Sequence, residues 1–171
     1  AWEATRREVM AVRDSVGINE VHNFGKYRIT GLGARDWLDR IMAGRIPKPG
    51  RVSLTPMLSA KGRLIGDFTV SCLNDQTFQL TASYGAQAYH MRWFEMNAVD
   101  GVRIENITDY LNGFQIAGPK SRDVLMACTR DAVADEAGAE GGLHAFGIHV
   151  RPRDDELAVL HPERAGERVE G

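Results

Sequence analysis

The sequence has little cysteine, no excess of charge of one sign and no long apolar run. Its 2 cysteines, Cys72 and Cys128, lie far apart without a CxxC spacing, so we expect buried thiols rather than a disulfide framework or a zinc site. The formal net charge of −2 argues against a nucleic-acid or anionic-membrane partner, because phosphate-binding surfaces are usually basic. No apolar run is long enough to span a membrane, and the N-terminal residues lack the apolar core of a signal peptide, which favours a cytoplasmic location.

Several catalytic motifs are also missing. The 5 histidines have no metal-ligand spacing, so no metal site is predicted. The Gly31-Leu32-Gly33 run lacks the third glycine of a dinucleotide-binding fingerprint and is better explained as a tight turn. Neither a Walker loop nor a nucleophile–histidine set with a recognisable spacing occurs, which removes the hydrolase and nucleotidase classes.

What is present is the composition and patterning of a globular chain. Hydrophobic residues make up 43% of the sequence and charged residues 26%, which is enough to build a core in 171 residues. Helical and strand-like periods alternate irregularly, which favours an α+β fold with antiparallel sheets and flanking helices over a wound βαβ fold. The expected helices cover residues 3–16, 34–42, 85–97 and a segment from 119; the expected strands cover residues 18–31, 63–73, 77–83, 102–107 and 114–117.

Helical spacing predicts two stripes that face the core. In the second helix, Trp37, Leu38 and Ile41 continue a pattern of i, i+3, i+4 and i+7 that begins at Ala34. The third helix presents another apolar stripe, which we expect to be core rather than an aromatic stacking platform. Its members are Ala86, Tyr89, Trp93 and Met96, with Phe94 beside them.

The most unusual strand carries an aspartate near its centre. Aspartate is depleted in strands because its short side chain competes for backbone hydrogen bonds. Alternation places Asp67 on the face opposite Phe68, and a turn at residues 74–76 predicts a hairpin with the next strand. Alternation alone favours the simpler interpretation that this polar face is merely solvated. With Leu73 opposite Thr77, the expected cross-strand pairs are Asp67–Ser83, Thr69–Thr81 and Ser71–Gln79.

Asp67 belongs to a series of motifs that spans about residues 3–130. The motifs occupy residues 8–17, 24–31, 50–58, 61–70, 106–108 and 117–122. In this order they resemble the folate-binding module of the glycine-cleavage T-protein (aminomethyltransferase) family. The closer resemblance is to the copy of that module at the C-terminal end of dimethylglycine and sarcosine dehydrogenases.

The resemblance implies a tetrahydrofolate-dependent one-carbon module. In such relatives an aminomethyl carrier, or an iminium formed by demethylation of a small methylated amine, delivers its carbon to N5 of tetrahydrofolate and gives 5,10-methylene-tetrahydrofolate. Asp67 matches the family's acidic position, so the resemblance makes it the catalytic residue that manages a proton near N10. Thr81 or Ser83 lies where relatives carry a polar pterin-side contact, often Asn, and Met57 and Leu58 match a segment that lines the pocket. FAD belongs only to a domain that precedes the module in the dehydrogenase relatives.

Residues 131–171 differ in character from the rest of the chain. They are rich in Ala, Gly, Glu, Asp and Arg, and Phe146 is their only aromatic residue, so we expect poor order over residues 131–142. The family motif Tyr-x-Gly-Glu-x-Gly-x-Glu has its nearest trace at residues 164–171, where Arg164 replaces Tyr and Val169 replaces Gly. Together with a first residue other than Met, this predicts a piece of a longer protein, T-protein-like over residues 1–130 and divergent or truncated over residues 131–171.

Three functions follow from these expectations. The first is an aminomethyltransferase-like enzyme whose activity is weak or absent in the fragment alone. The second is a non-catalytic folate-binding module. The third is a structural module that docks onto a flavoprotein domain or subunit. Titration with folate separates the first function from the other two.

Overall fold

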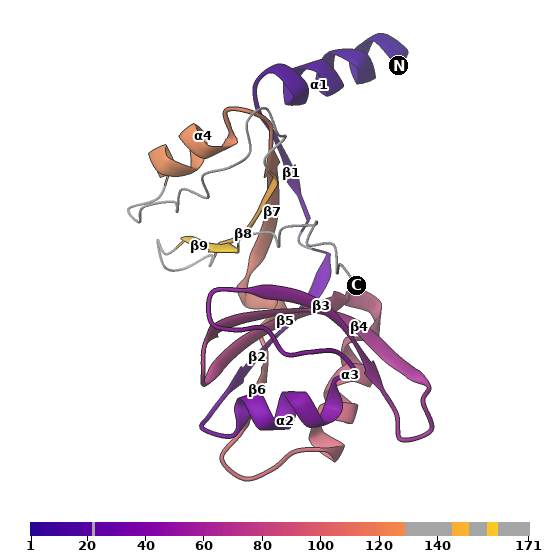
Figure 1. The fold of residues 1–171 in the computed structure, drawn as a ribbon. Helices are drawn as coiled ribbons and strands as arrows, with labels where there is room; N and C mark the ends of the chain where they lie inside the picture. The colour runs from indigo at the N-terminus through magenta and orange to yellow at the C-terminus, as the bar shows by residue number, and fades with distance from the viewer. Residues whose placement is uncertain (22, 129–144, 151–156, 161–171) are drawn as a thin grey trace, which may run out of the picture. The chain divides into compact units, whose positions relative to one another are not determined.

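The computed structural model describes residues 1–21, 23–128, 145–150 and 157–160, and it contains two compact units (Figure 1). Unit 1 is formed by the described parts of residues 1–22 and 112–162, and unit 2 contains residues 23–111. Each unit has its own antiparallel sheet with helices beside it. The expected α+β class with antiparallel sheets is therefore confirmed. The expected domain boundary near residue 130, the segment 131–142 and the motif trace at residues 164–171 lie outside the described residues.

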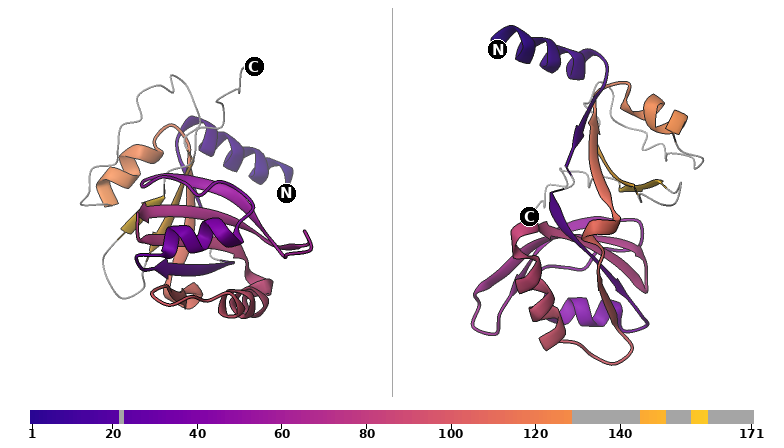
Figure 2. Two further views of the ribbon diagram at one scale, coloured as in Figure 1. Left: turned by 60° about the horizontal axis from the view of Figure 1, so that its bottom comes forward. Right: turned by 180° about the vertical axis from the view of Figure 1, so that it is seen from behind.

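Unit 1 is built on a four-stranded sheet in the order β1-β7-β8-β9. Both of its helices lie at the end of the sheet where Gly17 pairs with Ala117 (Figure 2). Gly118 makes this close approach possible: its φ is 122°, and a Cβ there would come within 2.4 Å of the Ser15 carbonyl oxygen. The elements are α1 (Trp2–Asp14), β1 (Gly17–Glu20), β7 (Asn112–Ala117), α4 (Ser121–Cys128), β8 (Ala145–Val150) and β9 (Leu157–Leu160).

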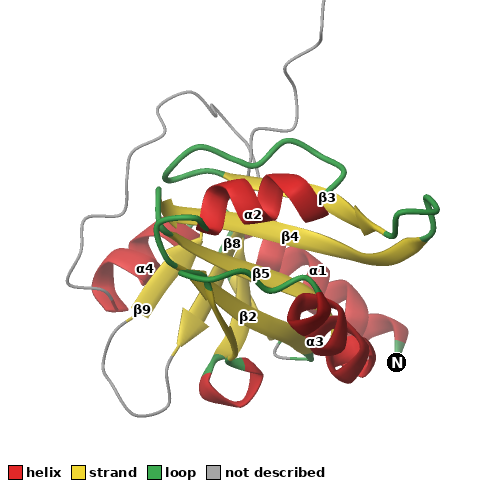
Figure 3. Ribbon diagram, turned by 90° about the horizontal axis from the view of Figure 1, so that it is seen from below, coloured by secondary structure: helices red, strands yellow, loops and turns green. Residues whose placement is uncertain are grey.

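Unit 2 contains a five-stranded antiparallel sheet in the order β3-β4-β5-β2-β6. Two helices, α2 and α3, lie on the same face of this sheet (Figure 3). The edge strand β3 tolerates Pro56, because a strand with one free side can lose an N–H donor. The strands are β2 (Phe24–Thr30), β3 (Val52–Leu58), β4 (Leu64–Asn74), β5 (Thr77–Ser83) and β6 (Arg103–Asn106); the helices are α2 (Ala34–Ile41) and α3 (Gln87–Met96), with short 3₁₀ turns η1 (Tyr84–Ala86) and η2 (Thr108–Tyr110).

The core of unit 2 fills the space between this sheet and its two helices. Trp37, Leu38 and Ile41 are buried in it, which confirms the stripe predicted for α2. The Trp37 indole Nε1 also donates a hydrogen bond to the carbonyl oxygen of Asn97 at 2.6 Å, which joins α2 to the end of α3. The strands contribute the other large side chains of the core, among them Tyr27, Phe68, Phe78 and Leu80.

The predicted stripe of α3 is wrong for Tyr89, which is 51% exposed, and for Met96, which is 70% exposed. Phe94 is buried as expected and Trp93 packs partly buried against the core, but the other buried residue of this helix is His90. Apolar side chains occur on every side of α3, so periodicity did not distinguish its inner face. A polar residue, His90, occupies an inner position, and this makes the pattern still harder to recognise.

Two other expectations need correction. Residues 18–31 do not form one strand: β1 ends at Glu20 and belongs to the sheet of unit 1, whereas β2 begins at Phe24 and belongs to the sheet of unit 2. No glycine or proline lies between Glu20 and Phe24, so the sequence does not mark the change of sheet clearly. The two thiols also differ, because Cys72 is buried as expected but Cys128 is exposed near the end of α4.

The β4–β5 hairpin has the expected register in its central part. Thr69 pairs with Thr81 and Ser71 with Gln79, which confirms two of the predicted pairs. Near the turn, however, Asn74 rather than Leu73 lies opposite Thr77, because an irregularity between Cys72 and Asn74 shifts the register.

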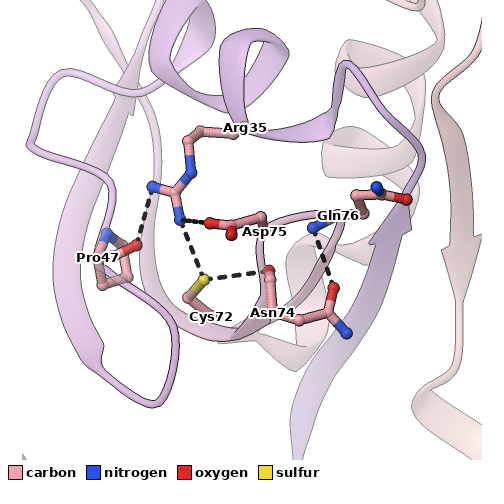
Figure 4. Close-up of polar contacts among 6 residues, drawn as sticks. All are labelled: Arg35, Pro47, Cys72, Asn74, Asp75 and Gln76. Carbon is pink, nitrogen blue, oxygen red and sulfur yellow. Dashed lines mark hydrogen bonds and ion pairs between the residues drawn. The ribbon is translucent and has the colours of Figure 1, made fainter.

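Arg35 at the start of α2 holds this hairpin turn (Figure 4). Its guanidinium donates to the Pro47 carbonyl oxygen at 3.0 Å, to Cys72 Sγ at 3.3 Å and to Asp75 Oδ1 at 3.4 Å. It also lies over the Phe78 ring, with 5.2 Å between Cζ and the ring centroid. One side chain thus joins α2, the loop after it and both strands of the hairpin.

Candidate functional site

Asp67 lies in the first half of β4, on the face of the sheet that α2 and α3 do not cover. Its side chain is exposed, whereas the next residue, Phe68, is fully buried on the helical face. The predicted alternation is therefore confirmed. Within the part of the chain that the structure describes, the Asp67 carboxylate makes no hydrogen bond or ion pair, so its oxygens are available to a ligand.

Antiparallel pairing arranges the side chains of this face in rows across the strands. The first row, near the start of β4, contains Pro56 opposite Asp67 on β3 and β4, and Ser83 opposite Phe24 on β5 and β2. The predicted pair Asp67–Ser83 is not formed, because the β4–β5 pairing ends at Thr69–Thr81. The second row is Leu54–Thr69–Thr81–Lys26, and the third is Val52–Ser71–Gln79–Arg28–Glu105.

Exposure changes from row to row. Ser71 and Gln79 in the third row are buried, Thr69 and Thr81 in the second row are half-buried, and Asp67 in the first row is exposed. Exposure on this face therefore increases from the third row to the row that carries Asp67.

The other residues predicted for the site occupy different places. Thr81 and Ser83 lie on the Asp67 face, Thr81 half-buried and Ser83 exposed at the end of β5. Met57 is fully buried in the core, where it pairs with Gly66, so it supports the sheet from the helical side. Leu58 follows an irregularity in β3 and is exposed at its edge.

Three residues of the Asp67 face had no part in the predicted site. Leu54 is 74% exposed and is a diagonal neighbour of Asp67, and Phe24 is 41% exposed opposite Ser83. Lys26 lies in the Leu54 row, and its Nζ donates to the Phe24 carbonyl oxygen at 3.0 Å. The alternation of Lys26 with Tyr27 and Ile29 was visible in the sequence, but the partner strands that bring it to this face were not.

Burial and a nearby carboxylate shift the pKa of Lys26 in opposite directions. Desolvation lowers the pKa of its ammonium, while the nearby Asp109 carboxylate acts in the opposite direction. The backbone around it is held by Thr108: the Lys26 amide donates to Thr108 Oγ1 at 3.0 Å. The Asp67 face thus combines a free carboxylate, hydroxyl groups, a buried ammonium and exposed apolar side chains.

A cavity of 630 Å³ lies elsewhere in unit 2, between the ends of α2 and α3 and the β3–β4 turn. Leu58 contributes to its wall together with Arg40, Trp93 and Met96. Asp67, Thr81 and Ser83 do not line it, so this cavity and the Asp67 face are different places. Over the described ranges, no cluster of three or more His, Cys, Asp or Glu residues could hold a metal ion. No helix among the described residues is both long enough and apolar enough to cross a membrane.

Comparisons with known proteins show the family of the chain. Residues 1–147 match a protein-family model, the GCVT N-terminal domain. Human dimethylglycine dehydrogenase, a mitochondrial protein by its name, is 35% identical over 138 residues, which is 79% of this chain but 16% of the dehydrogenase. The chain therefore spans only about a sixth of that relative.

Solved structures support the fold. Aminomethyltransferase T of the glycine cleavage system from Bartonella henselae superimposes on 71% of this chain and 34% of its own, with a TM-score of 0.63 at 17% identity. A chain of heterotetrameric sarcosine oxidase from Corynebacterium sp. U-96 matches 93% of this chain and 84% of its own, with a TM-score of 0.53 at 13% identity. The resemblance indicated by the sequence motifs is confirmed, and the chain belongs to the GCVT N-terminal domain family.

Proposed function

We propose that the chain is a tetrahydrofolate-dependent one-carbon transfer module in which Asp67 is the catalytic acid–base group. The observation that carries the proposal is an exposed aspartate in a strand, without a partner among the described residues, beside polar residues that are half-buried or buried. Aspartate at this place stabilises neither the strand nor an ion pair, so a ligand is the simplest reason for it.

The residues of this face fit a reduced pterin. A pterin is flat and apolar above and below, and its edge carries several N–H donors. Leu54 and Phe24 offer exposed apolar surface for the ring, while the Asp67 carboxylate and the hydroxyls of Thr81 and Ser83 can accept hydrogen bonds from the edge. Met57 supports this face only from the helical side of β3, and Leu58 lies in the wall of the other cavity, so neither is proposed to touch the ring.

The bound folate would supply N5 and N10, which would lose their protons as they bond to the carbon of an aminomethyl group or iminium, while ammonia or the amine leaves that carbon, to yield 5,10-methylene-tetrahydrofolate. The task of Asp67 is to accept and return the proton that moves during this transfer, and its exposed position lets it do so without breaking another contact. Thr81 and Ser83 orient the ligand edge. Leu54 and Phe24 exclude water from one side, which protects an iminium that water would hydrolyse.

A second function is favoured by one comparison. The sarcosine oxidase chain that this protein matches over 84% of its length is a part of a heterotetramer by its title. A docking module that partners a flavoprotein domain or subunit, with FAD held by the partner, is therefore the alternative. In either case the partner substrate is a small methylated amine or its iminium, and we propose a cytoplasmic location, which fractionation of expressing cells would test.

The experiment compares Asp67→Asn with the wild-type protein by calorimetric titration of tetrahydrofolate and by an assay of methylene-tetrahydrofolate formation. The substitution should leave the unfolding midpoint unchanged, because Asp67 has no partner among the described residues, and should slow product formation by about 10²- to 10⁴-fold. Asp39→Asn is the matched control, since Asp39 is an exposed aspartate on α2. Equal rates for Asp67→Asn and wild type would refute the catalytic role, and a wild-type protein that binds no tetrahydrofolate would favour the docking module.

A further inference from the structure

Among the described strands, the segment that carries Asp67 has a neighbour on only one side. Residues 64–67 of β4 pair with β3, at Gly66 with Met57 and at Asp67 with Pro56. On the other side, the pairing with β5 reaches only as far as Thr69. Strand β5 instead ends at Ser83 and continues through η1 into α3. The backbone just before Asp67 therefore needs a partner other than β5.

His90 of α3 supplies that partner from the helical side of the sheet. Its side chain is 1% exposed, and its ring is hydrogen-bonded to the backbone of Ile65. Gly66 allows this contact, because a Cβ at that position would be 2.5 Å from His90 Nε2. Since Nε2 faces β4, we assign the donated hydrogen bond to Nε2–H and the acceptor to the Ile65 carbonyl.

The other ring nitrogen joins His90 to β2. Nδ1 lies 3.0 Å from the Tyr27 hydroxyl, which donates to it when Nε2 carries the proton. The hydroxyl in turn lies against Gly25, where a Cβ would be 2.8 Å from Tyr27 Oη and 3.3 Å from the Ser83 carbonyl oxygen. The ring of Phe68 packs on the imidazole, with 4.7 Å between centroids, so the pair has little freedom to move.

Two contacts of this pair lie next to residues of the opposite face. Ile65 and Gly66 directly precede Asp67, and Gly25 directly follows Phe24, which pairs with Ser83 of β5. We propose that Tyr27 and His90 are a positioning pair that joins the backbone before Asp67 to the backbone beside Phe24 and so sets the positions of Asp67 and Phe24 on the ligand face. This inference rests on the proposed function of Asp67, although the pair itself does not touch the ligand.

The test separates positioning from ordinary core stability. His90→Leu removes both hydrogen bonds, whereas His90→Gln keeps an amide donor for Ile65. Phe94→Leu is the control, because Phe94 is also fully buried and lies on the same face of α3. The first readout needs no folate: amide hydrogen exchange and chemical shifts at Gly66 and Asp67. The second is the dissociation constant for tetrahydrofolate at equal folded fraction.

We expect His90→Leu to speed exchange at Gly66 and Asp67 by about tenfold or more and to weaken tetrahydrofolate binding by about tenfold, as expected for the loss of one or two buried hydrogen bonds. His90→Gln should recover part of both, and Phe94→Leu should change neither by more than about twofold beyond its global destabilisation. Equal effects of His90→Leu and Phe94→Leu at Asp67 would overturn the proposal.

If His90→Leu does not fold, Tyr27→Phe provides the same comparison, because it removes one hydroxyl and leaves both rings in place. It should shift the Gly66 and Asp67 signals more than Phe94→Leu does, and the opposite order would overturn the proposal. A wild-type protein that binds no tetrahydrofolate would refute the proposed function, while the exchange comparison would still decide whether Tyr27 and His90 hold this backbone.

Discussion

Replacement of Gly66 by alanine tests the packing beneath the Asp67 face. The added methyl group would lie 2.5 Å from His90 Nε2 and 2.9 Å from Phe68 Cε2. Both neighbours are fully or almost fully buried, so neither ring can move into solvent. Gly66 is not among the glycines with positive φ, and the effect of the substitution therefore comes from crowding rather than from backbone strain.

Its magnitude follows from two costs. Overpacking of a filled core costs about 1 to 3 kcal/mol. If the imidazole turns away, the Ile65 carbonyl also loses its hydrogen bond, and a buried polar group without a partner costs about 1 to 3 kcal/mol. Because relaxation of the rings lowers one cost while it raises the other, we expect a loss of about 2 to 4 kcal/mol in the free energy of unfolding.

The assay is urea unfolding of a double-mutant cycle. Gly66→Ala should cost much less in a His90→Ala background, because the ring that it meets is absent, and the coupling should exceed about 1 kcal/mol. Gly85→Ala is the control, since a Cβ there meets nothing within 4 Å, and its effect should stay within about 0.5 kcal/mol. A loss below about 0.5 kcal/mol for Gly66→Ala, or strict additivity with His90→Ala, would refute the described packing.

Two further predictions concern the same core. Trp37→Ala should lower the free energy of unfolding by about 3 to 5 kcal/mol, because the indole is 2% exposed. Trp2→Ala should lower it by less than about 0.5 kcal/mol, because Trp2 is 78% exposed. Equal thermal midpoints for the two variants would contradict the burial of Trp37. Burial also raises the pKa of Tyr27 to about 12 from its ordinary value of 10.0. The protonated phenol thus stabilises the fold fully below pH 10, and this contribution of about 3 kcal/mol is lost as the pH rises to 12. The difference in unfolding free energy between wild type and Tyr27→Phe should shrink over that range, and a difference that does not depend on pH would contradict the assignment.

Local patterns predicted the parts of the fold that depend on neighbouring residues. Alternation and a short turn were sufficient to predict that Thr69 pairs with Thr81 and that Asp67 and Phe68 lie on different faces of the sheet. The stripe of α2 was recognised because its polar and apolar sides are clearly separated. In α3 this separation is weak, and the most informative inner residue, His90, is polar.

The remaining features depend on contacts between distant segments. Leu54 and Phe24 reach the Asp67 face only through the β3–β4 and β2–β5 pairings, which no local period encodes. Strand β5 pairs with β4 only as far as Thr69, and His90 contacts the part of β4 beyond that point. Both features depend on where α3 packs against the sheet. Family motifs identified Asp67, whereas only the three-dimensional pairing shows which side chains surround it.

The most direct test of the central claim is a tetrahydrofolate titration of isotope-labelled protein, followed by backbone and methyl NMR signals. The proposed site predicts saturable shifts at Asp67, Thr81, Ser83 and the Leu54 methyl groups, with smaller changes at the cavity lined by Arg40 and Trp93. Shifts confined to that cavity, or no saturable shift at any of these residues, would contradict the assignment of the Asp67 face as the folate site.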